Sequence, residues 1–234
     1  MSNIEPNNKR STQLEKPSTP LSRREGQGGE SLAQGGESLV QGGESLVQGG
    51  KSLVQGGESF IRIILIGYMG AGKTTVGKEL AKALGLTFYD LDWYITTRMR
   101  RTVKEIFDER GEEGFRRIEH NMLHEVAEFE NVVISCGGGT PCFFDNMEYM
   151  NQQADTVYLK ASPEVLYAHL QMGKGVRPLL LNKTPDEVQQ FIREQLAYRE
   201  HFYSQARHIA DVNLMDNFSK IANTVADIRE MLGV

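Results

Sequence analysis

The chain has 234 residues, with 26 Lys and Arg against 31 Asp and Glu and a formal net charge of −5. A nucleic-acid-binding protein needs a strongly basic face, so this mild acidity argues against a nucleic-acid partner. No apolar run approaches the roughly 20 residues that span a membrane, and the N-terminus resembles neither a signal peptide nor a transit peptide. The two cysteines, Cys136 and Cys142, have no His or Cys partners at zinc-site spacing. We therefore expect a cytoplasmic protein with reduced thiols and no membrane partner.

Residues 1–59 differ in composition from the rest of the chain. The tripeptide Gln-Gly-Gly recurs with a period of seven, beginning at residues 27, 34, 41, 48 and 55. A period of seven is typical of a coiled coil, but two adjacent glycines per repeat cost a helix about 2 kcal/mol relative to alanine. The sequence therefore predicts a disordered low-complexity tail over 1–59 and one folded domain over 60–234.

Short apolar runs alternate with helical patterns along the folded part. Strands are expected at 61–66, 87–89, 132–135, 156–159 and 209–214. Helices are expected at 73–84, 92–100, 112–129, 163–171, 185–199 and 218–232. Strands separated by helices imply βαβ crossovers, so the fold class is α/β with a parallel sheet covered on both faces. Ligands of such sheets bind beyond the carboxyl ends of the strands.

A phosphate-binding motif follows the first expected strand. Residues 67–74 read Gly-Tyr-Met-Gly-Ala-Gly-Lys-Thr, which is G-x-x-x-x-G-K-[ST] between a strand and a helix. The backbone N–H groups and the helix N-terminus would bind phosphate, Lys73 would reach the β- and γ-phosphates, and the Thr74 hydroxyl would hold Mg²⁺. The alternative is a glycine-rich turn with a solvated lysine. The candidate nucleotide-binding residues are Gly67, Gly70, Ala71, Gly72, Lys73, Thr74 and Thr75.

Two carboxylates follow the second expected strand. Asp90 and Asp92 stand at i and i+2, and in an extended chain they point to the same side. We assign Asp90 to magnesium. Asp92 is the candidate that orients, and accepts the proton from, a hydroxyl that attacks the γ-phosphate. The alternative for Asp92 is an Asx turn or a helix cap.

An arginine and a glycine loop are candidates for binding the second substrate. Arg116 and Glu119 are three residues apart on an expected helix, so the glutamate can hold the guanidinium in one orientation. Such pairs are also common surface features. Gly137, Gly138 and Gly139 follow the third strand and let a ligand approach bare backbone, although a plain loop is the alternative.

Two further arginines lie late in the chain. Arg177 stands in the glycine-containing segment 172–178, which we interpret as a mobile lid that closes over the phosphates. Arg199 comes at the end of an expected helix. Taken alone, each is more often a surface residue. His120 and His124 stand at i and i+4 but lack a nearby third ligand, so we interpret them as a helix surface pair and not as a metal site.

The ordered set of motifs along residues 61–234 resembles the shikimate kinase family. The segments that carry the resemblance are Gly67–Thr75, Phe88–Asp92, Glu105–Phe107, Gly111–Glu112, Phe115–Glu119, Gly137–Pro141, Arg177–Leu179 and Arg199–Tyr203. The resemblance implies a P-loop kinase fold with a five-stranded parallel sheet and a lid. It also implies ATP-dependent phosphorylation of the 3-hydroxyl of shikimate, a step of chorismate and aromatic amino acid biosynthesis.

The resemblance also implies a role for each candidate. Lys73, Asp92 and Arg177 would be catalytic, and Arg177 would join the P-loop in binding the nucleotide. Thr74 and Asp90 would hold Mg²⁺. The residues expected to bind shikimate are Asp92, Arg116, Gly137, Gly138, Gly139 and Arg199. One departure is Glu200-His201-Phe202 after Arg199, where the family often shows x-Pro-Leu.

Two alternatives from other classes stay open. The chain could be another small-molecule P-loop kinase, acting on gluconate or a nucleoside monophosphate. It could also be a tail-mediated interaction protein with a vestigial kinase, although intact Lys73, Asp92, Arg116 and Arg177 argue against lost catalysis. Because the expected site lies within one domain, we expect a monomer that binds shikimate and ATP.

Overall fold

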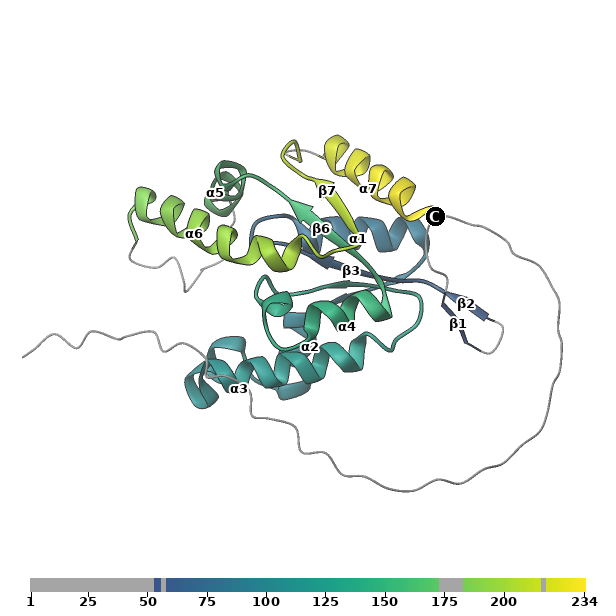
Figure 1. The fold of residues 1–234 in the computed structure, drawn as a ribbon, viewed down its shortest axis with the longest axis horizontal. Coiled ribbons are helices and arrows are strands. Elements are labelled where there is room, and N and C mark those ends of the chain that lie inside the picture. Colours follow the sequence, from purple (N-terminus) through teal and green to yellow (C-terminus); the bar gives the residue numbers. More distant parts are fainter. Residues whose placement is uncertain (1–52, 56–57, 173–182, 216–217) are drawn as a thin grey trace, which may run out of the picture. The chain divides into compact units, whose positions relative to one another are not determined.

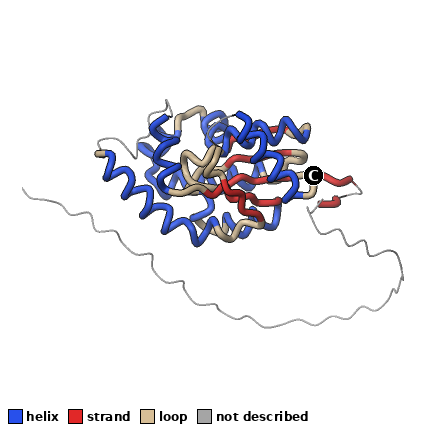
Figure 2. The backbone as a smooth tube through the Cα atoms, turned by 90° about the horizontal axis from the view of Figure 1, so that it is seen from above, coloured by secondary structure: helices blue, strands red, loops and turns tan. Residues whose placement is uncertain are grey.

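A five-stranded parallel sheet forms the centre of the folded unit (Figures 1 and 2). The computed structural model describes residues 53–55, 58–172, 183–215 and 218–234. The strand order is β4-β5-β3-β6-β7, and each neighbouring pair is parallel. The strands are β3 (Arg62–Ile66), β4 (Thr87–Asp90), β5 (Val132–Ser135), β6 (Asp155–Lys160) and β7 (His208–Asp211). The predicted α/β class with a five-stranded parallel sheet is confirmed.

Helices cover both faces of this sheet. The helices are α1 (Lys73–Leu84), α2 (Leu91–Met99), α3 (Val103–Val126), α4 (Asn146–Gln153), α5 (Pro163–Met172), α6 (Pro185–Tyr203) and α7 (Phe218–Leu232), with a short 3-10 turn η1 (Thr140–Cys142). Helix α1 contacts β5 and α7, whereas α4 contacts β6. Figure 1 shows α3 and α4 on the opposite side of the sheet from α7. Of the described helices, none combines the length and apolar character that a membrane crossing needs.

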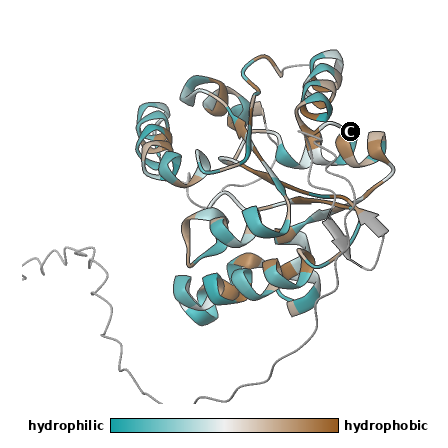
Figure 3. Cartoon of the chain, turned by 45° about the vertical axis from the view of Figure 1, so that its right-hand side comes forward, coloured by the Kyte–Doolittle hydropathy of each residue, from teal (hydrophilic) through white to brown (hydrophobic). Residues whose placement is uncertain are grey.

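The three central strands carry the core. Residues 63–66 of β3, 132–134 of β5 and 157–159 of β6 are at most 1% exposed. Strands buried on both faces read as continuous apolar runs, and this is why the sequence located them. Figure 3 shows the apolar strands in the middle and hydrophilic outer faces on the helices around them.

Capping side chains set the helix starts that the sequence predicted. Helix α6 begins after Thr184, whose hydroxyl accepts a bond from the Glu187 N–H while the Glu187 carboxylate accepts from the Thr184 N–H. Helix α5 begins at Pro163, where a proline fits the first turn without losing a hydrogen bond. Both starts match the expected positions.

Helix α3 differs from its prediction at both ends. It begins at Val103 behind a capping box of Thr102 and Glu105, and it ends at Val126 instead of residue 129. Gly111 interrupts it with φ 67° and ψ −175°, so two helical segments meet at that residue. The sequence pattern predicts only the second segment, because the glycine at residue 111 interrupts the helical pattern.

Three other elements were not predicted. Helix α4 follows Asp145 without a side-chain capping bond, and its two Asn residues are weak helix signals. An antiparallel pair, β1 (Leu53–Gln55) and β2 (Glu58–Phe60), lies at the end of the expected tail and reaches one residue into the expected domain. The sequence pattern does not predict this pairing. Residues 1–52 lie outside the described part, and the prediction for them stays a prediction.

Candidate active site

The loop between β3 and α1 forms the expected phosphate cradle. Gly72 sits at the N-cap of α1 with φ 85°, a left-handed conformation that favours glycine. A methyl group added there would also lie 2.2 Å from Cε of Met215. The Lys73 ammonium donates to the carbonyl oxygens of Gly67 at 2.8 Å and Tyr68 at 3.0 Å, which hold it over the loop. The cradle thus has its cation and its helix N-terminus at the carboxyl end of β3.

Two oxygen ligands for a hard cation meet beside Lys73. The Thr74 hydroxyl donates to Oδ2 of Asp90 at 2.9 Å, which joins the start of α1 to the end of β4. Oδ1 of Asp90 accepts from the Trp93 N–H at 3.2 Å and caps α2. The capping role that sequence left open for Asp92 therefore belongs to Asp90. Hydroxyl and carboxylate oxygens are the ligands that Mg²⁺ prefers, so this pair fits that ion.

Asp92 lies in the first turn of α2, and not in an extended chain as the sequence predicted. The helix starts at once because Asp90 caps it. Both aspartates nevertheless line the same pocket as Lys73. The two side chains therefore lie close together because β4 passes directly into α2, and not because alternate residues of a strand point to the same side.

The electrostatics of Asp92 suit a proton acceptor. The pKa of its carboxyl is raised from 3.8 to about 6, first by desolvation and then by the negative charges of Glu119 and Asp90. Lys73 and Arg116 act in the opposite direction. The Asp92 residue is exposed to the water of the cleft. A carboxylate with a raised pKa is a stronger base than a free one.

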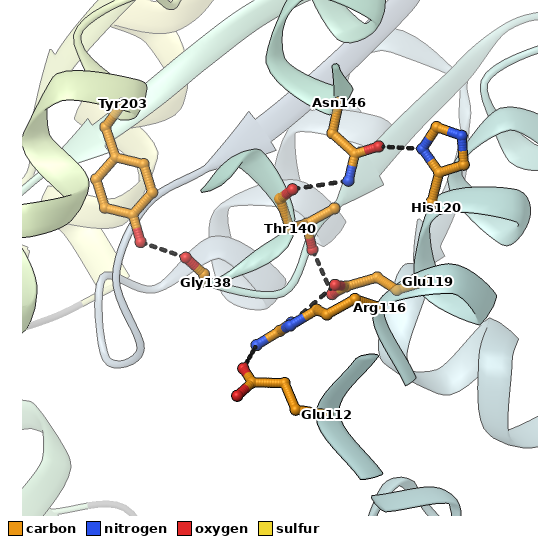
Figure 4. Close-up of polar contacts among 8 residues, drawn as sticks. All are labelled: Glu112, Arg116, Glu119, His120, Gly138, Thr140, Asn146 and Tyr203. Carbon is orange, nitrogen blue, oxygen red and sulfur yellow. Dashed lines mark hydrogen bonds and ion pairs between the residues drawn. The ribbon is translucent and has the colours of Figure 1, made fainter. Parts of the chain in front are cut away.

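Arg116 is held rigidly at the N-terminal end of the second segment of α3 (Figure 4). Its Nη1 donates to Oε2 of Glu119 at 2.8 Å, and its Nη2 donates to Oε1 of Glu112 at 3.3 Å. The Phe143 ring lies 4.2 Å from the guanidinium carbon. Within the described residues, Nε of Arg116 is buried and has no hydrogen-bond partner. The two glutamates and the Phe143 ring therefore fix the guanidinium in one orientation.

The three glycines after β5 bring the substrate candidates together. A methyl group added at Gly139 would lie 2.7 Å from Nη2 of Arg116. One at Gly138 would lie 3.2 Å from Nη1 of Arg199, and one at Gly137 would lie 3.2 Å from Oδ1 of Asp92. Any side chain here would displace a charged group. Three candidates from α2, α3 and α6 thus converge on one loop.

Arg199 reaches this loop from α6 despite the unusual residues that follow it. Its Nη2 donates to Oε1 of Gln195 at 3.0 Å, and its guanidinium lies 5.3 Å from the centre of the Tyr68 ring. Four residues later, Tyr203 is fully buried and donates its hydroxyl to the Gly138 carbonyl at 2.5 Å (Figure 4). Tyr203 therefore anchors the end of α6 to the glycine loop.

The phosphate cradle and the aspartates share a pocket of about 490 Å³. The predicted residues that line it are Gly70, Gly72, Lys73, Thr74, Thr75, Asp90, Asp92, Gly137 and Gly138. Arg116, Gly139 and Arg199 adjoin it through the glycine loop, while Gly67 and Ala71 shape the P-loop. Arg177 and the predicted lid over 172–178 fall almost wholly on residues 173–182, which lie outside the described residues.

Sequence reasoning assigned no role to several residues that complete the site. Thr140 donates its hydroxyl to Oε1 of Glu119 at 2.6 Å and ties the Arg116 pair to η1. His169 of α5 contacts the carbonyl of Gly70 at 2.9 Å, and Met215 lies against Gly72. For Tyr203, the Arg-x-x-x-Tyr spacing was visible in the sequence. For the others the signal lies only in the tertiary contacts.

Phosphate binding at one end of this pocket and charged acceptor groups at the other place the chain among the P-loop small-molecule kinases. The sequence matches the family model described as shikimate kinase over residues 69–230. The chain belongs to the shikimate kinase family, as its motifs predicted.

Individual relatives agree with this membership. A shikimate kinase of Phocaeicola vulgatus is 54% identical over 171 residues, which are 73% of this chain and 98% of that protein. The crystal structure of shikimate kinase from Bacteroides thetaiotaomicron has a TM-score of 0.74 at 51% identity, and the match covers 75% of this chain and all of that one. The Acinetobacter baumannii shikimate kinase, solved in complex with shikimate, has a TM-score of 0.66 at 32% identity and is covered to 94%, against 74% of this chain.

Proposed function

We propose that the chain transfers the γ-phosphoryl group of ATP to the 3-hydroxyl of shikimate. The observation that carries this proposal is the convergence of Asp92, Arg116 and Arg199 on the glycine loop, next to the P-loop. A small hydroxylated acid needs an anion clamp and a hydroxyl acceptor close to the phosphate cradle. Two arginines and one aspartate supply these groups, and the family relationship points to the same substrate.

The arginines would bind the carboxylate of shikimate. A guanidinium forms strong paired bonds with a carboxylate, and rigid orientation lowers the entropy lost on binding. Glu119, which is 1% exposed, fixes Arg116, and Gln195 together with the Tyr68 ring fixes Arg199. The bare backbone of Gly137–Gly139 leaves room for the substrate between them.

Asp92 would orient the 3-hydroxyl and take its proton as the oxygen attacks the γ-phosphorus. The bond from the γ-phosphorus to the β–γ bridging oxygen breaks, and ADP leaves with that oxygen. Lys73 and the N–H groups at the start of α1 would stabilise the negative charge that this oxygen gains. The roles of these residues are proposals that rest on their common pocket.

We assign the site of Mg²⁺ to Thr74 and Asp90. Their oxygens lie 2.9 Å apart beside Lys73, and both are hard ligands. When bound with ATP, the ion neutralises charge on the β- and γ-phosphates. Arg177 is proposed to act on the same phosphates from the lid.

An acceptor panel tests the proposal directly. The full chain is assayed with ATP and Mg²⁺ for ADP release, with shikimate, gluconate, CMP and AMP as acceptors in turn. We expect turnover with shikimate to exceed that with the other three by orders of magnitude. Equal or greater turnover with gluconate or a nucleoside monophosphate would assign the site to another small-molecule kinase.

We also propose that the enzyme works as a monomer in the cytoplasm. Both cysteines have free thiols, and the described candidate residues lie within one folded unit. Light scattering coupled to size-exclusion chromatography measures the molar mass in solution, and a mass near 26.3 kDa is expected for a monomer. A stable dimer would contradict it.

A further inference from the structure

Three potential metal ligands meet away from the pocket, on α3 and the loop before α4. They are His120, His124 and Asp145, and one ligand atom from each lies within 4.8 Å of the others. The two imidazole rings are 4.2 Å apart between centres. No third partner is evident for this histidine pair in the sequence, because Asp145 is distant along the chain. The fold supplies it.

The proton position on His120 is set by its neighbour Asn146 (Figure 4). The Asn146 amide donates from Nδ2 to the Thr140 carbonyl at 2.8 Å, so its oxygen faces the ring. Nδ1 of His120 lies 2.6 Å from that oxygen and must donate to it. In the neutral ring the lone pair is then on Nε2. Metal-binding histidines commonly have this arrangement, in which the second nitrogen donates to a fixed acceptor.

His124 has a buried nitrogen without a partner. Within the described residues, Nε2 of His124 is inaccessible to water and makes no hydrogen bond. Its ring stacks on Tyr149 with centres 3.5 Å apart, which fixes the ring plane. An imidazole nitrogen without a partner is a potential metal ligand.

Asp145 has a carboxylate that its own helix does not use. It occupies the N-cap position of α4, yet its side chain makes no capping bond there. The side chain is 65% exposed, and Oδ1 lies 3.8 Å from Nδ1 of His120. An exposed side chain can rotate at little cost, so the carboxylate is the ligand that can adjust its position.

We propose that His120, His124 and Asp145 bind a divalent transition metal of the zinc type, with water as a further ligand. Imidazole selects Zn²⁺ and its neighbours over Mg²⁺, which prefers oxygen ligands. Tetrahedral bonds of about 2.0–2.2 Å bring ligand atoms to within about 3.5 Å of one another. Rotation of the exposed Asp145 side chain would bring its carboxylate closer to the two rings. None of the three residues lines the nucleotide pocket, so this site is separate from the proposed magnesium site.

Calorimetric titration of Zn²⁺ into the full, untagged chain tests the proposal, with excess Mg²⁺ present throughout. We expect one tightly bound Zn²⁺ ion per chain. His120→Gln, His124→Gln and Asp145→Asn should each weaken binding about 10-fold or more. His201→Gln, which changes a histidine outside the cluster, should leave the affinity unchanged and serves as the matched control.

A second measurement keeps the result independent of folding. Zn²⁺ should raise the Tm of the wild-type chain by mass action, and this rise should be smaller in Asp145→Asn, whose exposed residue tolerates exchange. Absence of binding at about 100 μM Zn²⁺, where even a weak site with a Kd on the order of 100 μM would be half-filled, would overturn the proposal. So would binding that survives all three exchanges or that is lost in Cys142→Ser instead.

Discussion

The carboxylate of Glu119 binds Arg116 and Thr140 at the same time. One oxygen lies 2.8 Å from Nη1 of Arg116, and the other accepts the Thr140 hydroxyl at 2.6 Å. Because the glutamate side chain is 1% exposed, these partners replace the water that its charge would otherwise have. The position of Arg116 is thus coupled to the loop that carries Gly137–Gly139.

Arg116→Ala should weaken shikimate binding. Loss of the guanidinium leaves the carboxylate of shikimate without its partner, which costs about 1.5–3 kcal/mol of binding free energy. This cost corresponds to a rise of about 10- to 150-fold in the KM for shikimate. The KM for ATP should change little. Arg117→Ala is the matched control, because Arg117 is 70% exposed and pairs only with Glu113 among the described residues. An unchanged KM in Arg116→Ala would remove this residue from the clamp.

Lys73→Met should lower turnover by about 10²- to 10³-fold through lost stabilisation of charge on the transferred phosphoryl group. The methionine keeps the length of the side chain but donates no bond to phosphate. Steady-state kinetics with saturating shikimate measure the effect. Lys78→Met, on the exposed face of α1, should behave as the wild type. Near-normal turnover in Lys73→Met would contradict the proposed role.

Activity should rise with pH through about 6, where the carboxyl of Asp92 loses its proton. Only the carboxylate can accept the hydroxyl proton, so kcat/KM should level off above this range. Asp92→Asn should lower kcat by about 10²- to 10⁴-fold. The residual activity should also lose the acid limb near pH 6. A limb that persists in the variant would show that another group titrates.

The carboxyl of Asp92 should make the free energy of unfolding fall as pH rises, whereas an ion-paired aspartate makes it rise. Its pKa is raised on folding, so between about 4 and 6 the folded chain holds more protons than the unfolded chain. Its favourable contribution is complete below about 4 and is lost as pH rises through 6. In urea unfolding, Asp92→Asn should therefore stabilise the chain at pH 7.5 and have little effect at pH 4. Cleft water, which reaches the carboxylate, limits the size of the gain.

Gly139→Ala should raise the KM for shikimate by displacing Arg116. The added methyl group would lie 2.7 Å from Nη2, so the guanidinium must move. The double variant Gly139→Ala/Arg116→Ala identifies this cause, because an effect that acts through Arg116 adds little once Arg116 is absent. Strict additivity of the two changes would instead indicate a direct clash between the methyl group and the substrate.

Tyr203→Phe should loosen the glycine loop. The Gly138 carbonyl would lose the buried hydroxyl that donates to it at 2.5 Å, a loss of about 1–3 kcal/mol in the free energy of unfolding. A modest rise in the KM for shikimate should accompany the loss of stability. Tyr198→Phe, on a 63% exposed residue of the same helix, should change neither quantity.

Much of the fold could be predicted because the central strands are buried on both faces and read as apolar runs. The P-loop could also be predicted, since its glycines and lysine act locally between β3 and α1. Helix α4 and the first segment of α3 were missed, because their residues carry weak or interrupted helix signals.

The candidate site was only partly visible in the sequence. Asp92, Arg116 and Arg199 could be named from motifs, but the contact that joins them depends on how α2, α3 and α6 pack around one loop. The wrong conformation for Asp92 has a local cause, since nothing in the sequence showed which aspartate caps α2. Asp145 was not associated with the histidine pair for the same reason that Thr140 was not associated with Glu119: only tertiary contacts join them.

The break at Gly111 has a consequence for amino-acid exchanges nearby. Because the backbone at Gly111 is not helical, the helical path of residues 103–110 is not continuous with that of the segment that carries Arg116. The exposed pair of Lys104 and Asp108 lies wholly within the first segment. Exchanges at this exposed pair can therefore leave the register of the residues proposed to bind the acceptor unchanged.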